Sequence, residues 1–257
     1  MTTAEKAELL RSLHVPGDPL IVTNIWDAAS AQAVAAVPGV RALATASAAV
    51  SQSRGVPDGE GLTVDQALDA AGVIARSVDL PVSVDFERGY AGDAAGVESN
   101  VRRLAEAGAA GLNFEDSTSD TAMRDLREQV ERLRAVRAGG AAAGVPLSIN
   151  ARVDSLRRGE SFAQAVERAN AYLDAGGDSV FVLGLDTADD VARAVAEIAG
   201  PVAVIGWHGY LPLSQLAQLG VARVSFGPAP QALTLRHLAA AAGAVTARRD
   251  YPAELTF

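Results

Sequence analysis

The 257-residue sequence contains no cysteine. Disulfide bonds, thiolate metal ligands and a thiol nucleophile or base are therefore excluded. Histidine occurs only three times, and aromatic residues make up 5% of the chain. These residues are too few to indicate a function by themselves.

Positive charge is also scarce. The chain has 22 Lys and Arg residues against 31 Asp and Glu residues, which gives a formal net charge of −9. This balance argues against nucleic acid as a partner. It still allows an anionic substrate, because a metal ion and one or two arginines can reverse the sign of the charge locally.

Long apolar runs are missing. The most apolar region, residues 20–51, is interrupted by several polar residues and by Pro38, so it does not have the composition of a membrane-spanning helix. The first six residues carry charge and lack the apolar core of a signal peptide. We therefore expect a cytoplasmic protein without a membrane partner.

Short apolar strands alternate with helices along the whole chain. The expected strands are 20–27, 40–47, 81–90, 111–116, 147–154, 179–185, 202–207 and 221–227. Helices are expected at 2–12, 63–77, 94–107, 124–138, 161–175, 212–219 and 229–247. Two more are expected, one that follows the first strand and ends at about residue 37 and one that begins at residue 187. Eight such repeats in a chain of this length predict one (β/α)₈ TIM-type barrel domain over residues 1–257.

An open, doubly wound sheet is the alternative fold. It usually carries a glycine-rich nucleotide-binding turn after its first strand. Here that place reads Asp27-Ala28-Ala29-Ser30. The sequence therefore favours the barrel.

The stretch Pro81–Tyr90 has the pattern of a buried strand that ends in acidic residues. Alternation places its apolar residues on one face and Ser83, Asp85 and Glu87 on the other. Two buried carboxylates on one face are costly unless something neutralises them. A bound cation would do so.

Further polar residues follow the next two expected strands. Strand 111–116 brings Asn113 and Glu115, and strand 147–154 brings Arg152. Catalytic groups of a barrel lie at the carboxyl ends of its strands, so these side chains should meet Asp85 and Glu87 there. Oxygen ligands alone favour Mg²⁺, or Mn²⁺, over zinc. Arg152 would suit a substrate carboxylate, which it can bind through two parallel hydrogen bonds.

Single acidic residues at strand ends have a simpler interpretation. Asp27 and Asp116 could serve only as helix caps. His208 is expected at the surface or behind the site rather than as a ligand.

Six segments, taken in order, resemble the isocitrate lyase/phosphoenolpyruvate mutase superfamily along nearly the full length of the chain. They are Asn-Ile-Trp-Asp-Ala-Ala-Ser-Ala at 24–31, Ala-Thr-Ala-Ser at 44–47, Gly-Val-Pro-Asp-Gly at 55–59, Val-Asp-Phe-Glu-Arg-Gly-Tyr at 84–90, Gly-Ala-Ala-Gly-Leu-Asn-Phe-Glu-Asp-Ser at 108–117 and Asn-Ala-Arg-Val-Asp at 150–154. The resemblance implies a barrel whose subunits exchange their last helices, in a homotetramer built from dimers.

The resemblance also implies roles for individual residues. Asp85 resembles the direct metal ligand, and three carboxylates resemble ligands that act mainly through metal-bound water: Asp58, Glu87 and Glu115. Arg152 resembles the substrate-binding arginine. Three consecutive residues resemble the cradle for the substrate carboxylate: Thr45, Ala46 and Ser47. We expect catalysis to depend on Arg152, Glu115 and Asp58, with Asp85 and Asn113 also contacting the substrate.

The chain departs from the family pattern at the loop after the fourth strand. Residues 117–124 contain no Cys, Lys or His, whereas the lyases of the family have a catalytic cysteine there, and the asparagine of the mutase loop is absent too. Leu183 and Ile205 stand where the tricarboxylate lyases place polar residues. The remaining candidates for a general base are His208, Tyr90 or a metal-bound hydroxide.

These features predict a Mg²⁺-dependent lyase. It would cleave a C–C bond of a small 2-oxo or 2-hydroxy di-acid, similar to oxaloacetate or a substituted malate, through a metal-stabilised enolate. Two alternatives remain open. One is a phosphonopyruvate-type P–C bond hydrolase or phosphonomutase, and the other is a barrel that binds an oxo-acid without turnover.

Overall fold

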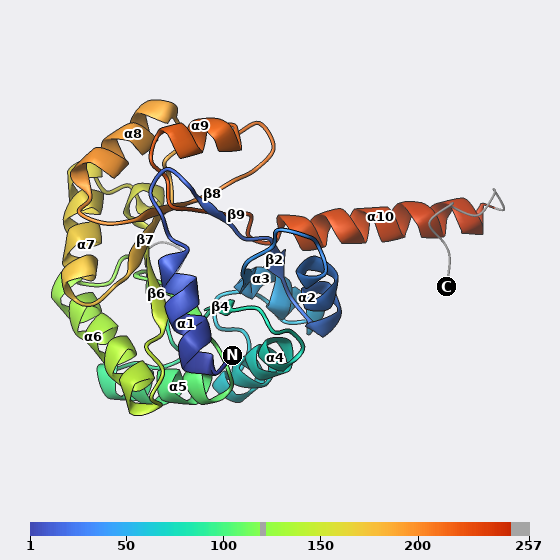
Figure 1. The fold of residues 1–257 in the computed structure, drawn as a ribbon, viewed down its shortest axis with the longest axis horizontal. Coiled ribbons are helices and arrows are strands. Elements are labelled where there is room, and N and C mark those ends of the chain that lie inside the picture. The colour runs from blue at the N-terminus through green and yellow to red at the C-terminus, as the bar shows by residue number, and fades with distance from the viewer. Residues whose placement is uncertain (119–121, 248–257) are drawn as a thin grey trace.

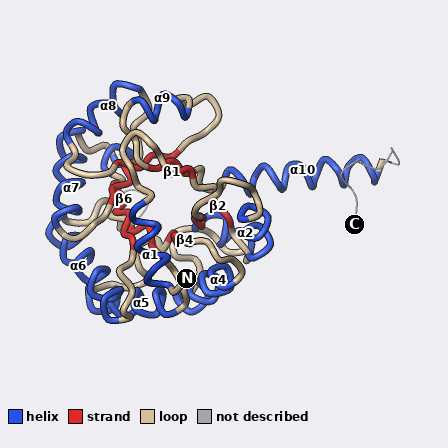
Figure 2. The backbone as a smooth tube through the Cα atoms, viewed as in Figure 1, coloured by secondary structure: helices blue, strands red, loops and turns tan. Residues whose placement is uncertain are grey.

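The computed structural model describes residues 1–118 and 122–247. Within them, nine parallel strands form one sheet in the order β1-β9-β8-β7-β6-β5-β4-β3-β2. The strands are β1 (Leu20–Ile21), β2 (Asn24–Ile25), β3 (Leu43–Thr45), β4 (Val82–Asp85), β5 (Gly111–Phe114), β6 (Ser148–Val153), β7 (Ser179–Val182), β8 (Val202–Ile205) and β9 (Arg223–Ser225). Figure 2 shows them curled at the centre of the molecule, with most of the helices outside.

Helices connect the strands, and most of them lie around the outside of the sheet (Figure 1). They are α1 (Thr3–Ser12), α2 (Ala28–Ala35), α3 (Ser47–Ser53), α4 (Val64–Arg76), α5 (Ala94–Glu106), α6 (Leu126–Ala142), the 3₁₀ helix η1 (Ser155–Arg158), α7 (Phe162–Asp174), α8 (Ala188–Glu197), α9 (Leu213–Gln218) and α10 (Ala229–Thr246). Thr63 and Ser161 cap the starts of α4 and α7 with reciprocal side-chain hydrogen bonds. The predicted α/β barrel architecture is confirmed.

The sheet closes through one segment of the chain. Leu20 of β1 pairs with Arg223 of β9, and Asn24 of β2 pairs with Ala44 of β3. The single strand expected at 20–27 is therefore two short pieces, one on each side of the seam. The Asn24 side chain bridges the two sides of this seam, since it donates to the Thr45 carbonyl of β3 at 2.9 Å and accepts from the Phe226 amide, directly after β9, at 2.7 Å.

The strands expected at 40–47 and 81–90 are shorter in the structure. Helix α3 begins at Ser47 directly after β3, and β4 ends at Asp85. The expectation that Glu87 continues the strand face of Asp85 was wrong, because Glu87 has a φ of 47° and Gly89 one of 87°. This left-handed turn is favoured by Gly89, where an added Cβ would lie 2.9 Å from the Phe114 ring.

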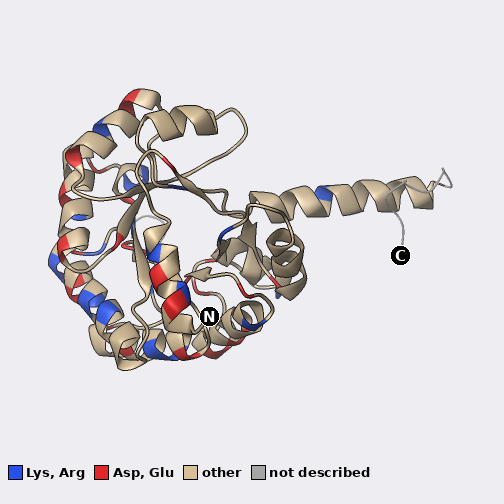
Figure 3. Cartoon of the chain, viewed as in Figure 1, with Lys and Arg blue, Asp and Glu red and all other residues tan. Residues whose placement is uncertain are grey.

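Helix α10 extends away from the rest of the molecule (Figure 1). Its start is held by the Gln231 side chain, which donates to the Ala49 carbonyl at 2.8 Å. Beyond that point Leu233, Leu235 and Leu238 are 51%, 43% and 65% exposed. Figure 3 shows that charged residues are sparse along this helix. No helix in the described part of the chain has the length and apolar character needed to cross a bilayer.

A buried histidine follows α1. His14 is 7% exposed, and the Leu10 carbonyl accepts a hydrogen bond from its Nδ1 at 2.8 Å. Burial, together with the nearby charge of Arg223, lowers the pKa of His14 to about 4. The imidazole is therefore neutral in the folded protein at pH values where it would be protonated in the unfolded chain.

This difference makes folding stability depend on pH. Between the ordinary pKa of 6.5 and the folded pKa of about 4, the unfolded state binds a proton that the native state does not, so stability falls as pH is lowered. Between pH 8 and pH 5, His14 should cost the wild type about 2 kcal/mol of unfolding free energy. The variant His14→Gln should lack this loss, as urea titrations at both pH values would show. Equal losses in the two proteins would contradict the assignment.

Candidate active site

The carboxyl ends of the strands surround a cavity of about 160 Å³, which we call the inner cavity. Six residues expected at the site line it: Ala46, Ser47, Asp58, Asp85, Asn113 and Arg152. A second, outer cavity of about 250 Å³ shares Asp58 and Arg152 with it and adds Glu87 and Glu115. The predicted residues are thus gathered around two adjoining cavities, with Thr45 behind Asp85.

The Asp85 carboxylate is held from the neighbouring strand and helix. The Asp85 amide donates to Thr45 Oγ1 at 2.8 Å, and the Ser47 amide donates to Asp85 Oδ2 at 3.0 Å. Oδ1 of Asp85 is buried and has no hydrogen-bond partner among the described residues. A buried carboxylate oxygen without a donor is costly, so Oδ1 is suited to a cation or a ligand donor.

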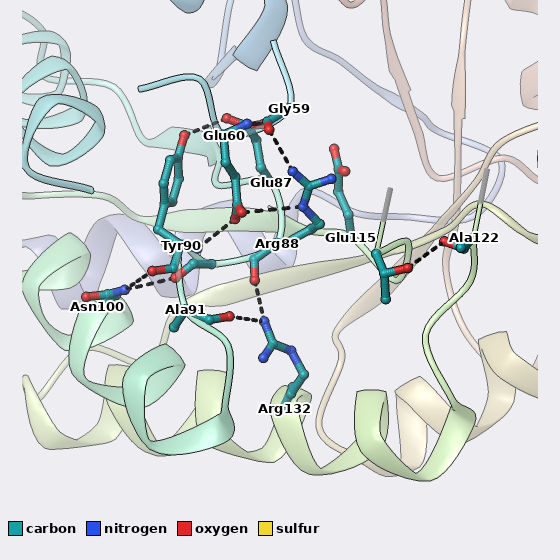
Figure 4. A network of polar contacts seen from close by, with 12 residues as sticks. Gly59, Glu60, Glu87, Arg88, Tyr90, Ala91, Asn100, Glu115, Ala122 and Arg132 are labelled. Atoms are coloured by element: carbon teal, nitrogen blue, oxygen red, sulfur yellow. Dashed lines mark hydrogen bonds and ion pairs between the residues drawn. The ribbon is translucent and has the colours of Figure 1, made fainter. Parts of the chain in front are cut away.

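Glu87 belongs to a compact network of hydrogen bonds with Glu60 and Tyr90 (Figure 4). The Tyr90 hydroxyl donates to Glu87 Oε1 at 2.5 Å, and the Glu60 amide donates to Oε2. The Tyr90 amide in turn donates to the Glu60 carboxylate at 2.7 Å. In the described residues, Glu60, Glu87 and Tyr90 are also the non-glycine residues with positive φ. Left-handed backbone at such residues costs energy and concentrates at functional sites.

Burial is the main influence on the protonation of Glu87 and Tyr90 in this network. It raises the pKa of Glu87 to about 7, with further increases from the charges of Asp85 and Asp58, while the Tyr90 hydrogen bond works in the opposite direction. Burial and the Glu87 carboxylate raise the pKa of Tyr90. Tyr90 therefore remains protonated and acts as a donor, so it does not fit the expected role of a general base.

Arg152 is surrounded by carboxylates. Its Nε donates to Asp154 Oδ1 at 2.7 Å, its Nη2 donates to Asp154 Oδ2 at 3.3 Å, and its Nη1 pairs with Glu115. Burial raises the pKa of Glu115, and the Arg152 charge opposes that rise. Part of the Arg152 guanidinium is thus already occupied, and a substrate carboxylate would share it with these acids.

Asp116 proved not to be a helix cap. It is fully buried; its Oδ1 accepts from the Asp154 amide at 2.9 Å and its Oδ2 from the Tyr172 hydroxyl at 2.8 Å. Burial and the charge of Asp154 raise the pKa of Asp116 to about 7. Asp116 therefore ties the ends of β5 and β6 together behind Arg152. Asp27, by contrast, caps α2 as expected.

A chain of side-chain hydrogen bonds orients Asn113. The Ser179 hydroxyl donates to Asn150 Oδ1 at 2.7 Å, and Asn150 Nδ2 donates to Asn113 Oδ1 at 2.9 Å. All three residues are at most 6% exposed. This arrangement leaves the Asn113 amide nitrogen available to donate to a ligand in the inner cavity.

The opposite wall of the inner cavity is apolar. Leu183 and Ile205, which stand where the resemblance places the polar residues of the tricarboxylate lyases, line it together with Phe181. His208 lies exposed in a turn after β8 and lines neither cavity. Of the loop expected at 117–124, residues 119–121 lie outside the described part, while Ser117 and Met123 form an antiparallel bridge.

The site suits a hard divalent cation in its chemistry. The buried Asp85 Oδ1 without a partner and the desolvated carboxylates of Glu87 and Glu115 are oxygen ligands of the kind that Mg²⁺ prefers. In residues 1–118 and 122–247, however, no group of three or more His, Cys, Asp or Glu residues is arranged to hold a metal ion. The metal therefore stays a prediction.

The fold and these cavities define a TIM-like α/β barrel with its candidate site at the carboxyl ends of the strands. The family model described as phosphoenolpyruvate phosphomutase matches residues 10–246. The chain therefore belongs to this family, and the predicted membership of the phosphoenolpyruvate mutase/isocitrate lyase superfamily is confirmed.

Individual relatives cover most of the chain. An uncharacterized protein of Mycobacterium tuberculosis is 34% identical, covering 95% of this chain and 92% of its own length. A 2-methylisocitrate lyase of Aeropyrum pernix is 29% identical, with coverages of 85% and 72%. A solved structure from Burkholderia cenocepacia J2315, provisionally named as a phosphonomutase, has a TM-score of 0.89 and 36% identity, with coverages of 94% and 98%.

The hydrogen bond from the Tyr90 hydroxyl to Glu87 can be tested directly. The variant Tyr90→Phe removes the donor to Glu87 and leaves a buried carboxylate oxygen without its partner. We expect the free energy of unfolding to fall by about 1–3 kcal/mol, as measured by urea denaturation at pH 8. Circular dichroism should confirm that the fold is kept. An unchanged free energy of unfolding would mean that this hydrogen bond does not hold the turn.

Proposed function

We propose that the protein is a Mg²⁺-dependent lyase that cleaves a C–C bond of a small 2-oxo or 2-hydroxy di-acid. The observation that carries this proposal is the buried Asp85 Oδ1, which has no partner among the described residues and belongs to a side chain that lines the same cavity as Arg152. A cation ligand and a substrate arginine on one cavity are the two elements that enolate chemistry requires.

The carboxylates would hold the ion in two ways, directly or through water. Asp85 would bind Mg²⁺ directly, and Asp58, Glu87 and Glu115 would act through water, because Mg²⁺ keeps part of its hydration shell. Bound there, Mg²⁺ would supply a Lewis acid for the oxygen on carbon 2 of the substrate. The hydrogen bonds to Glu87 and Asp85 would keep these carboxylates in place before the ion arrives.

The chain's own groups would hold the acid. Ala46, Ser47 and the Asn113 amide would receive one carboxylate, while Thr45, which lines neither cavity, would position Asp85. Arg152 would stabilise negative charge that develops as the bond breaks. Leu183, Ile205 and Phe181 would exclude water from that charge. Their apolar wall favours a small substrate over a tricarboxylate.

The proton balance favours decarboxylation over aldol-type cleavage. Cleavage of a substituted malate needs a base for the hydroxyl proton. The Tyr90 hydroxyl is a donor to Glu87 and His208 lines neither cavity, so of the three candidates only a metal-bound hydroxide would be left for that role. Loss of CO₂ from an oxaloacetate-like acid yields the enolate without such a base. An oxaloacetate decarboxylase of Bradyrhizobium sp., 29% identical over 87% of this chain and 78% of its own length, agrees with this choice.

A ¹H NMR turnover screen would test the proposal. The full chain with Mg²⁺ would meet oxaloacetate, substituted malates, methylisocitrate and phosphonopyruvate. We expect EDTA-sensitive formation of an oxo-acid that exceeds the spontaneous rate. Asp85→Ala should lower it on the order of 100-fold, whereas Asp69→Ala, which changes an exposed carboxylate on α4, should not. Equal turnover by wild type and Asp85→Ala would refute the proposal.

Two other outcomes of the screen would support the alternatives. Release of phosphate from phosphonopyruvate would favour P–C chemistry, which agrees with the provisional name of the Burkholderia structure at 36% identity. Oxalate binding that requires Mg²⁺, with no product from any acid, would favour a barrel that binds oxo-acids without turnover.

We also infer a homo-oligomer, in which α10 packs against a second copy of the chain. The exposed leucines of α10 are costly in water, and the helix has few charges of its own. Exchange of this helix between subunits would cover them.

The mass of the protein in solution tests this inference. Light scattering after gel filtration should give a multiple of the 26.3 kDa chain. Leu238→Asp on α10 should shift the mass toward 26.3 kDa, because a buried charge would oppose the interface. Val73→Asp, at an exposed apolar residue of α4, serves as the control and should leave the mass unchanged. A monomeric wild type would refute the inference.

A further inference from the structure

The outer cavity differs from the inner cavity in its charge. Its lining includes three acidic residues, Asp58, Glu87 and Glu115, and three arginines: Arg88, Arg152 and Arg158. The inner cavity shares only Arg152 as a cation and has a largely apolar far wall. A ligand that extends from the inner into the outer cavity passes Arg152 and enters a charged environment.

Two of the three arginines are already engaged. Arg88 donates to the Gly59 carbonyl at 2.7 Å and lies 3.4 Å from the Glu60 carboxylate. Arg152 pairs with Glu115 and Asp154. Their positive charges are therefore largely used to hold loops and strand ends together.

Arg158 is different. It is the last residue of η1, which follows β6 and its Arg152. Its side chain makes no hydrogen bond or ion pair to the described residues, and its Nε is buried without a partner. Its neighbour Arg157, on the same short helix, instead pairs with Asp186 at 2.7 Å. Arg158 is thus a partly desolvated cation beside the cavity without a counter-ion in the described chain.

We propose that Arg158 forms an anion subsite for the second acidic group of the substrate. This inference rests on the proposed function and specifies its substrate class. One carboxylate would occupy the cradle at Ser47 and Asn113, while the other would reach the outer cavity, where Arg158 can bind it through charge-assisted hydrogen bonds. The residue would therefore select di-acids over mono-acids that share the same 2-oxo or 2-hydroxy carboxylate end.

Malate and lactate form a matched pair of probes, because both are 2-hydroxy acids and malate carries one carboxylate more. Calorimetric titrations of the full-length protein with Mg²⁺ would give a Kd for each acid. Arg158→Gln should weaken malate binding about tenfold, the loss expected for a charge-assisted hydrogen bond, and change lactate binding less than twofold. Arg157→Gln is the matched control and should change neither Kd.

The outcomes separate this subsite from the proposed lyase activity. Malate binding that depends on Arg158, in a protein that turns over none of the screened acids, would support the subsite and count against the lyase. A wild type that cleaves a di-acid, with a malate Kd that Arg158→Gln leaves within twofold, would overturn the subsite alone. Equal weakening of malate and lactate, or a wild type that binds malate no more tightly than lactate, would also overturn it.

Discussion

The burial of several carboxylates at one end of the barrel is the constraint on which the rest of the site depends. Asp85, Glu87, Glu115 and Asp116 all end β4 or β5 or follow them directly. Desolvation opposes their charge and raises the pKa of the last three. The protein offsets this cost with fixed donors: Ser47 on Asp85, Tyr90 on Glu87, Arg152 on Glu115 and Tyr172 on Asp116. Among these four carboxylates, Asp85 retains a buried oxygen, Oδ1, without a donor, and its side chain lines the inner cavity.

The backbone after β4 also serves to provide a buried carboxylate with donors. β4 stops at Asp85, and the left-handed turn after it sends Glu87 to the Glu60 amide and the Tyr90 hydroxyl. The strained turn thereby satisfies a carboxylate that a straight strand would bury without donors. Behind it, the Arg132 guanidinium, 1% exposed, donates to the Arg88 and Ala91 carbonyls (Figure 4). The turn is therefore anchored from both sides, which gives the site preorganised carboxylates.

Periodicity and strand-end chemistry predicted the barrel and the meeting of Asp85, Asn113 and Arg152 around one cavity. The family resemblance, in turn, implied Asp58 as a further site residue and apolar side chains at Leu183 and Ile205. Periodicity could not predict the left-handed φ of Glu87, because alternation assumes that a strand continues until a breaker, and Gly89 comes two residues too late. Glu60 was missed for a related reason: it lies in a loop, and only the tertiary fold brings its amide to Glu87. The position of Arg158 could not be predicted from the sequence either. Arg157 and Arg158 are adjacent residues of the same type, and only the structure shows that Arg157 pairs with Asp186 while Arg158 lines the outer cavity.

The division into two cavities gives these differences a chemical meaning. The inner cavity offers hydrogen-bond donors and an apolar wall, which suit the reacting end of a small acid. The outer cavity offers charge: Glu87 accepts from the Tyr90 hydroxyl and Glu115 pairs with Arg152, while Arg158 has no such partner in the described residues. An uncompensated cation beside a polar cavity attracts the anion that neutralises it. Specificity in this branch of the family would then come from short connections such as η1 rather than from the strand-end residues that bind the cation, because a connection can change its side chains without disturbing the barrel.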